Sequence, residues 1–113
     1  MKEIEICTSL EQVRENIDRI DNCIVQLICE REQFVLQAAQ FKKNETEVKA
    51  PNRVEQVIQK VVSIANELGG NPAIIERIYR AMISAFTDSE LKEHSKLQIR
   101  SLTNGEPDGA VIS

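Results

Sequence analysis

The chain has 113 residues, of which 42% are hydrophobic and 28% are charged, and this is typical of a single globular domain. Its net charge of -4 argues against nucleic-acid binding, because a protein that binds this polyanion needs a basic face to displace counterions. No apolar run approaches the roughly 20 residues that cross a bilayer, and the first residues lack a signal-peptide core. We therefore expect neither nucleic acid nor membrane as a partner.

The first predicted element is one long helix from Ser9 to Lys43. Thr8 suits its N-cap, and Glu11 lies where a capping box places the reciprocal acceptor. The apolar residues then step by three and four along the segment, which marks one buried helix face. The positions on this face are Leu10, Val13, Ile17, Ile20, Ile24, Leu27, Arg31, Phe34, Ala38 and Phe41.

Two further helices follow a polar segment at 44–50. Pro51 suits the first turn of the second helix, which Gly69 and Gly70 end. Asn71 and Pro72 are typical of the cap and first position of the third helix. No strand pattern is present. The predicted fold class is all-α, with three helices per chain and one long N-terminal helix.

The C-terminal residues differ in composition from the rest. From about Ile99 the chain loses its helical period and gains Gly, Pro and Asp. This change predicts a helical domain at 1–98 and a disordered tail at 99–113.

The length of the first helix indicates a dimer. A helix from Ser9 to Lys43 measures about 52 Å, whereas a compact chain of this size has a radius of gyration of about 13 Å. Its apolar face would therefore extend beyond any three-helix monomer, and a two-fold homodimer is the commonest way to cover it. An elongated coiled-coil dimer without a site is the alternative.

Arg31 occupies a place where the apolar pattern predicts Leu or Ile. A guanidinium taken out of water costs several kcal/mol unless an anion meets it. The neighbouring Glu30 and Glu32 point about 100° away from this face, so an ion pair with either of them explains Arg31 poorly. We expect Arg31 to receive a protein carboxylate or an anionic ligand.

Four more charged residues are candidates for the same site. On one straight helix Lys42 would share the face of Arg31 about 16 Å along the axis, whereas Arg14 could join only from a second copy. Arg53 can fold over the region from the second helix, and Glu90 extends an apolar spacing on the third. Alone, Lys42 followed by Lys43 is more often a solvated helix end, and the single histidine, His94, is expected in solvent.

The cysteines indicate reduced thiols. Cys7, Cys23 and Cys29 are odd in number and lack the spacing of metal ligands. Cys23 and Cys29 fall on opposite sides of a helix, so no intrahelical disulfide is expected. A cytoplasmic location follows from this interpretation.

Two segments carry a family resemblance. The run VRENIDRID..IVQLICER...V..A..FK from Val13 to Lys42, followed by APNRV from Ala50 to Val54, resembles the all-helical chorismate mutases. It is more similar still to the isochorismate-pyruvate lyases of salicylate-siderophore pathways, over about residues 7–97. The resemblance implies an intertwined homodimer with two sites, each built from both chains.

The resemblance also implies a role for each charged residue. Arg31, with Arg14 of the partner copy, would bind the carboxylates of a dianionic substrate, and Arg53 would close the site. Lys42 would face the ether oxygen, with Glu90 as the second group beside it. Both reactions are pericyclic, so the resemblance implies no metal and no cofactor.

Two positions bear on the reaction. The family usually has glutamine where this chain has Glu90, so we expect Glu90 to be protonated in the active form. Mutases commonly place acidic residues where this chain has Ala50 and Val54, and the lyases have apolar ones.

The sequence alone puts chorismate mutase, of aromatic amino-acid biosynthesis, narrowly before the lyase. An aminated chorismate analogue as substrate and a non-catalytic helical binding module remain open.

Overall fold

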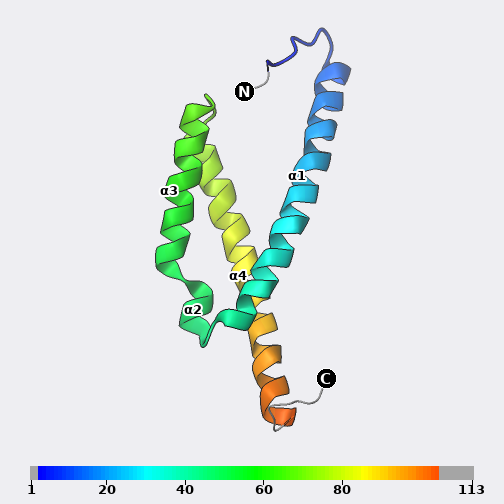
Figure 1. The fold of residues 1–113 in the computed structure, drawn as a ribbon. Coiled ribbons are helices and arrows are strands. Elements are labelled where there is room, and N and C mark those ends of the chain that lie inside the picture. The colour runs from blue at the N-terminus through cyan, green and yellow to red at the C-terminus, as the bar shows by residue number, and fades with distance from the viewer. Residues whose placement is uncertain (1–2, 105–113) are drawn as a thin grey trace. The chain divides into compact units, whose positions relative to one another are not determined.

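The computed structural model describes residues 3–104, and all regular structure within them is helical (Figure 1). Three long helices, α1 (Leu10–Ala38), α3 (Pro51–Glu67) and α4 (Pro72–Asn104), confirm the predicted all-α class. Two short elements lie between α1 and α3: the 3-10 helix η1 (Ala39–Phe41) and the five-residue helix α2 (Glu45–Lys49). By its internal contacts the chain divides into an N-terminal unit, Met1–Phe34, and a C-terminal unit, Val35–Ser113.

The N-terminal unit holds most of α1. Ser9 Oγ accepts a hydrogen bond from the Gln12 amide at 3.1 Å, and Gln12 Oε1 accepts one from the Thr8 amide at 2.8 Å. Ser9 is therefore the N-cap, one residue later than the predicted Thr8. The side chain that reaches back is Gln12 and not the predicted Glu11, and it binds the Thr8 amide. The hydroxyl of Ser9 reaches the third amide of the helix as it begins, so Thr8 remains outside.

The apolar face of α1 is uncovered in the single chain. No residue of α1 is buried, and Leu10 and Leu27 keep 61% and 64% of their surface exposed. Such large apolar side chains, repeated at helical spacing on one face, normally mark a protein contact.

α1 ends earlier than the sequence predicted. It closes at Ala38, tightens into η1, and leaves Lys42 extended at φ -103° and ψ 138°. Lys42 is therefore not on the same α-helix as Arg31, and the prediction of one helix from Ser9 to Lys43 was wrong. The physical reason is that Ala39 is buried, 2% exposed, where η1 contacts α4.

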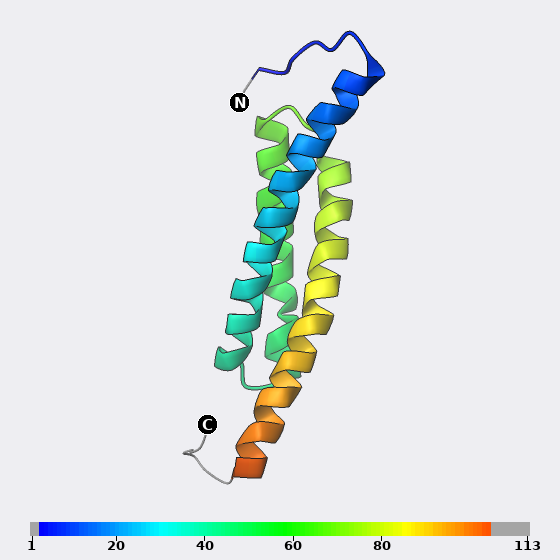
Figure 2. The ribbon, with the colours of Figure 1, turned by 90° about the vertical axis from the view of Figure 1, so that its right-hand side faces the viewer.

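The C-terminal unit is built on α3 and α4, which lie antiparallel and side by side (Figures 1 and 2). Between them the Gly70 amide donates to Ala65 O at 2.8 Å while Gly69 takes a positive φ of 76°. These two features form a Schellman motif. Asn71 Oδ1 then accepts from the Ala73 amide at 3.0 Å. The predicted end of α3 and start of α4 are confirmed.

A surface ion pair adds a second link between these helices. The Arg80 guanidinium donates to both carboxylate oxygens of Glu55 at 2.9 and 3.0 Å, and to Glu76 at 2.9 Å. The hydrogen bonds from Arg80 hold the pKa of Glu55 below its ordinary value. Because all three side chains are largely exposed, the network orients the helices and adds little stability.

The segment expected to be a polar connection contains α2. Asn44 caps it by accepting from the Glu47 amide at 2.9 Å, and Val48 is buried at 2% exposure. Ala50 ends α2 with a left-handed φ of 39° and redirects the chain into α3.

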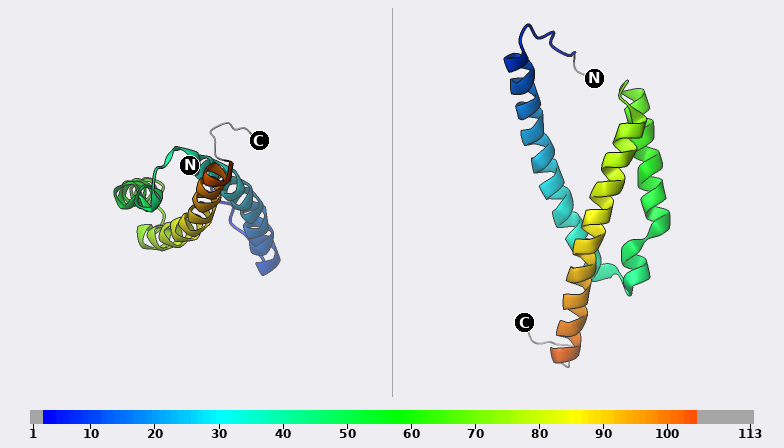
Figure 3. Two further views of the ribbon diagram at one scale, coloured as in Figure 1. Left: turned by 90° about the horizontal axis from the view of Figure 1, so that it is seen from below. Right: turned by 180° about the vertical axis from the view of Figure 1, so that it is seen from behind.

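α4 is longer than the predicted domain boundary at residue 98. It continues to Asn104 and runs past the ends of α2 and α3 (Figures 2 and 3). Residues 105–113, most of the predicted tail at 99–113, lie outside the described residues.

The core of the described residues is small. Its buried apolar side chains are Ala39, Val48, Ile58 and Ala65, all of them in the C-terminal unit. Two polar residues, Glu90 and His94, are buried as well. Across 3–104 no helix combines the length and apolar character that a membrane span requires.

Candidate functional site

Glu90 and Lys42 form an ion pair in the C-terminal unit. Lys42 Nζ lies 2.7 Å from Glu90 Oε2, and the two side chains are 25% and 6% exposed. Although the atoms are close, Glu90 Oε2 takes part in no directed hydrogen bond within the described residues. The pair is thus held mainly by charge, with the Lys42 ammonium group as the cation that compensates the buried carboxylate.

The burial of Glu90 follows from its place on α4. The spacing Tyr79, Ile83, Phe86, Glu90 keeps one side of the helix turned inward, and the first three are half-buried. Glu90 continues that side at 4% exposure. A carboxylate is rarely buried without a partner, and here Lys42 supplies the opposite charge.

The backbone beside Lys42 is also bound to α4. His94 Nε2 lies 2.8 Å from Lys42 O, and Gln98 Nε2 donates to Lys43 O at 3.3 Å. His94 is 5% exposed, so the expectation that it lies in solvent was wrong. Its spacing of four residues from Glu90 was the available sequence signal, since both side chains then share one helix face.

The side of Lys42 towards the end of α4 is open. A depression of about 340 Å³ lies there, lined by Ala39, Gln40, Lys42, His94, Leu97, Gln98, Ser101 and Leu102. No acidic side chain lines it. Glu90, which holds the ammonium group of Lys42, is not among the lining residues.

Arg53 belongs to the same unit as this pair. It lies on the first turn of α3, directly after the left-handed turn at Ala50, and its side chain is exposed. Such an exposed cation is suited to meet an anion that arrives from solvent.

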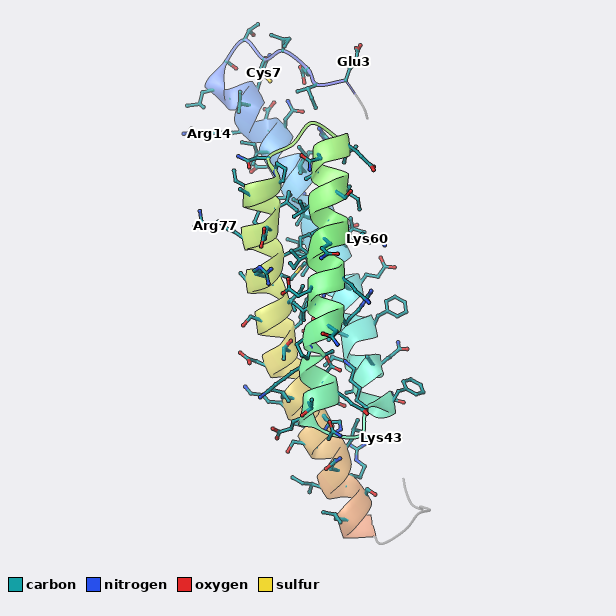
Figure 4. The ribbon with its side chains drawn as sticks, turned by 90° about the vertical axis from the view of Figure 1, so that its left-hand side faces the viewer. Glu3, Cys7, Arg14, Lys43, Lys60 and Arg77 are labelled. Atoms are coloured by element: carbon teal, nitrogen blue, oxygen red, sulfur yellow. The ribbon has the colours of Figure 1, made fainter. Side chains whose placement is uncertain are left out.

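Arg14 and Arg31 lie on α1, in the N-terminal unit. Arg14 is exposed and extends outward from the helix (Figure 4), and Arg31 is half-buried. The structure thus brings together Lys42 and Glu90, and the grouping of both arginines with them stays a prediction.

The ion pair predicts the effect of removing its cation. Lys42→Met should lower the free energy of unfolding by about 2 kcal/mol at pH 7, because the buried Glu90 carboxylate loses its counter-charge. Urea denaturation at one protein concentration measures this. The double variant Lys42→Met with Glu90→Gln should recover most of the loss, since no buried charge remains. Lys43→Met is the matched control, and an equal loss for the two lysines would contradict the prediction.

The comparisons with known proteins agree with the expected family. The sequence model of the family described as chorismate mutase type II matches residues 13–91. The chain is also similar to isochorismate pyruvate lyase from Pseudomonas aeruginosa, with 35% identity over 92 residues. That alignment covers 81% of this chain and 91% of the lyase. Together with the all-helical fold and the lysine that meets a buried acid, these matches show that the chain belongs to the chorismate mutase type II family of enzymes.

Proposed function

We propose that this chain cleaves the enolpyruvyl ether bond of isochorismate to give salicylate and pyruvate. The observation that carries this choice is the similarity to the Pseudomonas lyase, which extends over nearly the whole of that protein. It reverses the narrow order that the sequence alone favoured. Apolar Ala50 and Val54, where mutases commonly have acidic residues, support the same choice.

The residue types suit this chemistry. The carbon–oxygen bond breaks while a ring hydrogen passes to the methylene carbon of the departing enolpyruvyl group, so the ring becomes aromatic and the side chain leaves as pyruvate. Substrate orientation accounts for much of such catalysis, and Arg31, with Arg53 and Arg14 of a second copy, would bind the two carboxylates. Lys42 would donate to the ether oxygen as negative charge grows there.

Glu90 determines how strongly Lys42 can act. As a carboxylate it shares the ammonium charge and repels a developing oxyanion, whereas as a carboxylic acid it adds a second donor. The distance of 2.7 Å between Nζ and Oε2 supports this direct coupling. We infer that the productive complex has Glu90 protonated.

The second candidate is the rearrangement of chorismate to prephenate. The match to the chorismate mutase type II model over residues 13–91 favours it. The same ether bond breaks, and the same Lys42 would stabilise the oxygen, so a mixture of both activities is compatible with one site. A non-catalytic dimer is the outcome if neither substrate reacts.

Parallel turnover of the purified chain on isochorismate and chorismate tests the proposal. We expect kcat/KM for salicylate formation to exceed that for prephenate formation, and Lys42→Met to lose about 100-fold or more on both. Lys43→Met should retain turnover within about twofold, because its ammonium lies outside the proposed site. Predominant prephenate would make the chain a mutase, and absence of both products would refute the enzyme assignment at this site.

The role of Glu90 predicts the effect of a neutral donor in its place. Glu90→Gln supplies an amide N–H where the carboxylic acid would donate, so it should keep kcat within about threefold of the unaltered enzyme. Glu90→Leu has no donor and should lose about 100-fold in kcat. Equal losses in the two variants would contradict this prediction.

An intertwined homodimer belongs to the same proposal. Its support is the uncovered apolar face of α1, on which Ile17, Ile20 and Ile24 are each about half exposed: 50%, 45% and 46%. A second copy related by a two-fold axis would cover this face and bring its own Arg14 towards the site. A cytoplasmic location also goes with the proposal, since Cys7, Cys23 and Cys29 carry free thiols.

Two substitutions, each of which introduces one carboxylate on α1, test the dimer. Ile20→Glu places a carboxylate on the apolar face and should convert the dimer to monomer with loss of turnover. Asn22→Glu adds the same charge on the opposite side of α1 and should leave a dimer. Light scattering coupled to size exclusion reads the mass of each. Equal masses for the two variants would argue against α1 as the interface.

A further inference from the structure

His94 is a buried polar group that neither the family resemblance nor the proposed chemistry uses. It is the single histidine of the chain and is 5% exposed. Within the described residues its ring makes one hydrogen bond, to the carbonyl of Lys42 at 2.8 Å. Because a carbonyl oxygen only accepts, Nε2 carries the proton and donates it.

The carbonyl of Lys42 depends on the hydrogen bond from His94. Lys42 follows η1 in an extended conformation, so its carbonyl lies outside any helical hydrogen-bond ladder. Its amide has only a long contact, 3.4 Å, to Ala39 O. A carbonyl that lost its bond beside the buried ring of His94 would cost free energy comparable to a lost hydrogen bond. The contact therefore determines which way the Lys42–Lys43 peptide plane faces.

The orientation of that peptide sets the direction of the lysine side chain. Glu90 and His94 lie one turn apart on α4, so one helix binds both the ammonium group and the backbone of the same residue. A lysine side chain is flexible and loses much entropy when held in one rotamer. Binding at two points on a rigid helix places the ammonium group before substrate arrives.

We propose that His94 is a positioning residue for Lys42: through the Lys42 carbonyl it holds the lysine ammonium where it meets the ether oxygen. The inference rests on the proposed function, in which Lys42 is the donor to that oxygen. His94 itself touches no reacting atom in this scheme. A displacement of about 1 Å in a positioned group can cost about 100-fold in rate.

Two substitutions separate positioning from packing. His94→Leu fills the site without a donor, and His94→Gln supplies an amide N–H at similar reach. We expect His94→Leu to lower kcat by up to about 100-fold with KM changed less than about threefold, since the residues that bind the carboxylates are untouched. His94→Gln should restore most of kcat. Lys96→Leu is the matched control, because this exposed side chain lies about 200° around α4 from His94 and its loss should keep kcat within about twofold.

A second readout does not depend on turnover. Acylation of each lysine by a water-soluble anhydride, followed by peptide mass spectrometry, reports how firmly Lys42 is held against Glu90. We expect the Lys42 rate to rise severalfold in His94→Leu and to return in His94→Gln, with exposed Lys60 (Figure 4) unchanged as the internal reference. Circular dichroism confirms that each variant is folded.

The outcomes are distinguishable. If the unaltered chain turns over neither substrate but Lys42 acylation changes as expected, the positioning of Lys42 holds and the proposed function fails. Unchanged acylation of Lys42 in His94→Leu overturns the inference. So does a kcat in active protein that stays constant while acylation rises. A loss of kcat that follows melting temperature, without rescue by His94→Gln, assigns His94 to packing and also overturns it.

Discussion

The attachment of the Lys42–Lys43 backbone to α4 is the constraint on which the C-terminal unit depends. Two side chains of α4, His94 and Gln98, bind consecutive carbonyls of this extended segment, and Glu90 binds its ammonium group. On either side of the segment the buried residues Ala39 and Val48 anchor η1 and α2. The attachment of this segment to α4 thus accounts for three features together. They are the end of α1, the turn into α2 and the burial of an acid on α4.

The burial of two polar side chains, Glu90 and His94, calls for a function that offsets its cost in stability. The apolar core within 3–104 is small, and Glu90 and His94 occupy space that leucine would fill with more stability. Instead of stability, these two groups control Lys42. The carboxylate of Glu90 sets the charge around the ammonium group, and the imidazole of His94 sets where the side chain points. In an enzyme whose substrate reacts by a pericyclic route, a fixed donor at the breaking bond is the main electrostatic contribution that the protein can make.

Local chemistry explains why much of the fold could be predicted. The ends of α3 and α4 depend on Pro51, Gly69 and Asn71, whose backbone preferences act within a few residues and need no tertiary partner. The burial of Glu90 was likewise visible, since one helical period connects it to apolar residues on the same face. α2 was missed because its five residues show no period, and Val48 becomes a core residue only in contact with the rest of the unit.

The sequence by itself determined the helical class, the three long helices and the residue types of the candidate site, because periodicity and capping are encoded within one or two turns. The tertiary structure alone decided that α1 stops at Ala38, that Lys42 leaves the helix, and that His94 is buried. The physical reason is sequence separation: the hydrogen bond between His94 and the Lys42 carbonyl joins residues 52 positions apart. No local pattern in α1 can indicate a partner that only the packing of α4 brings within reach.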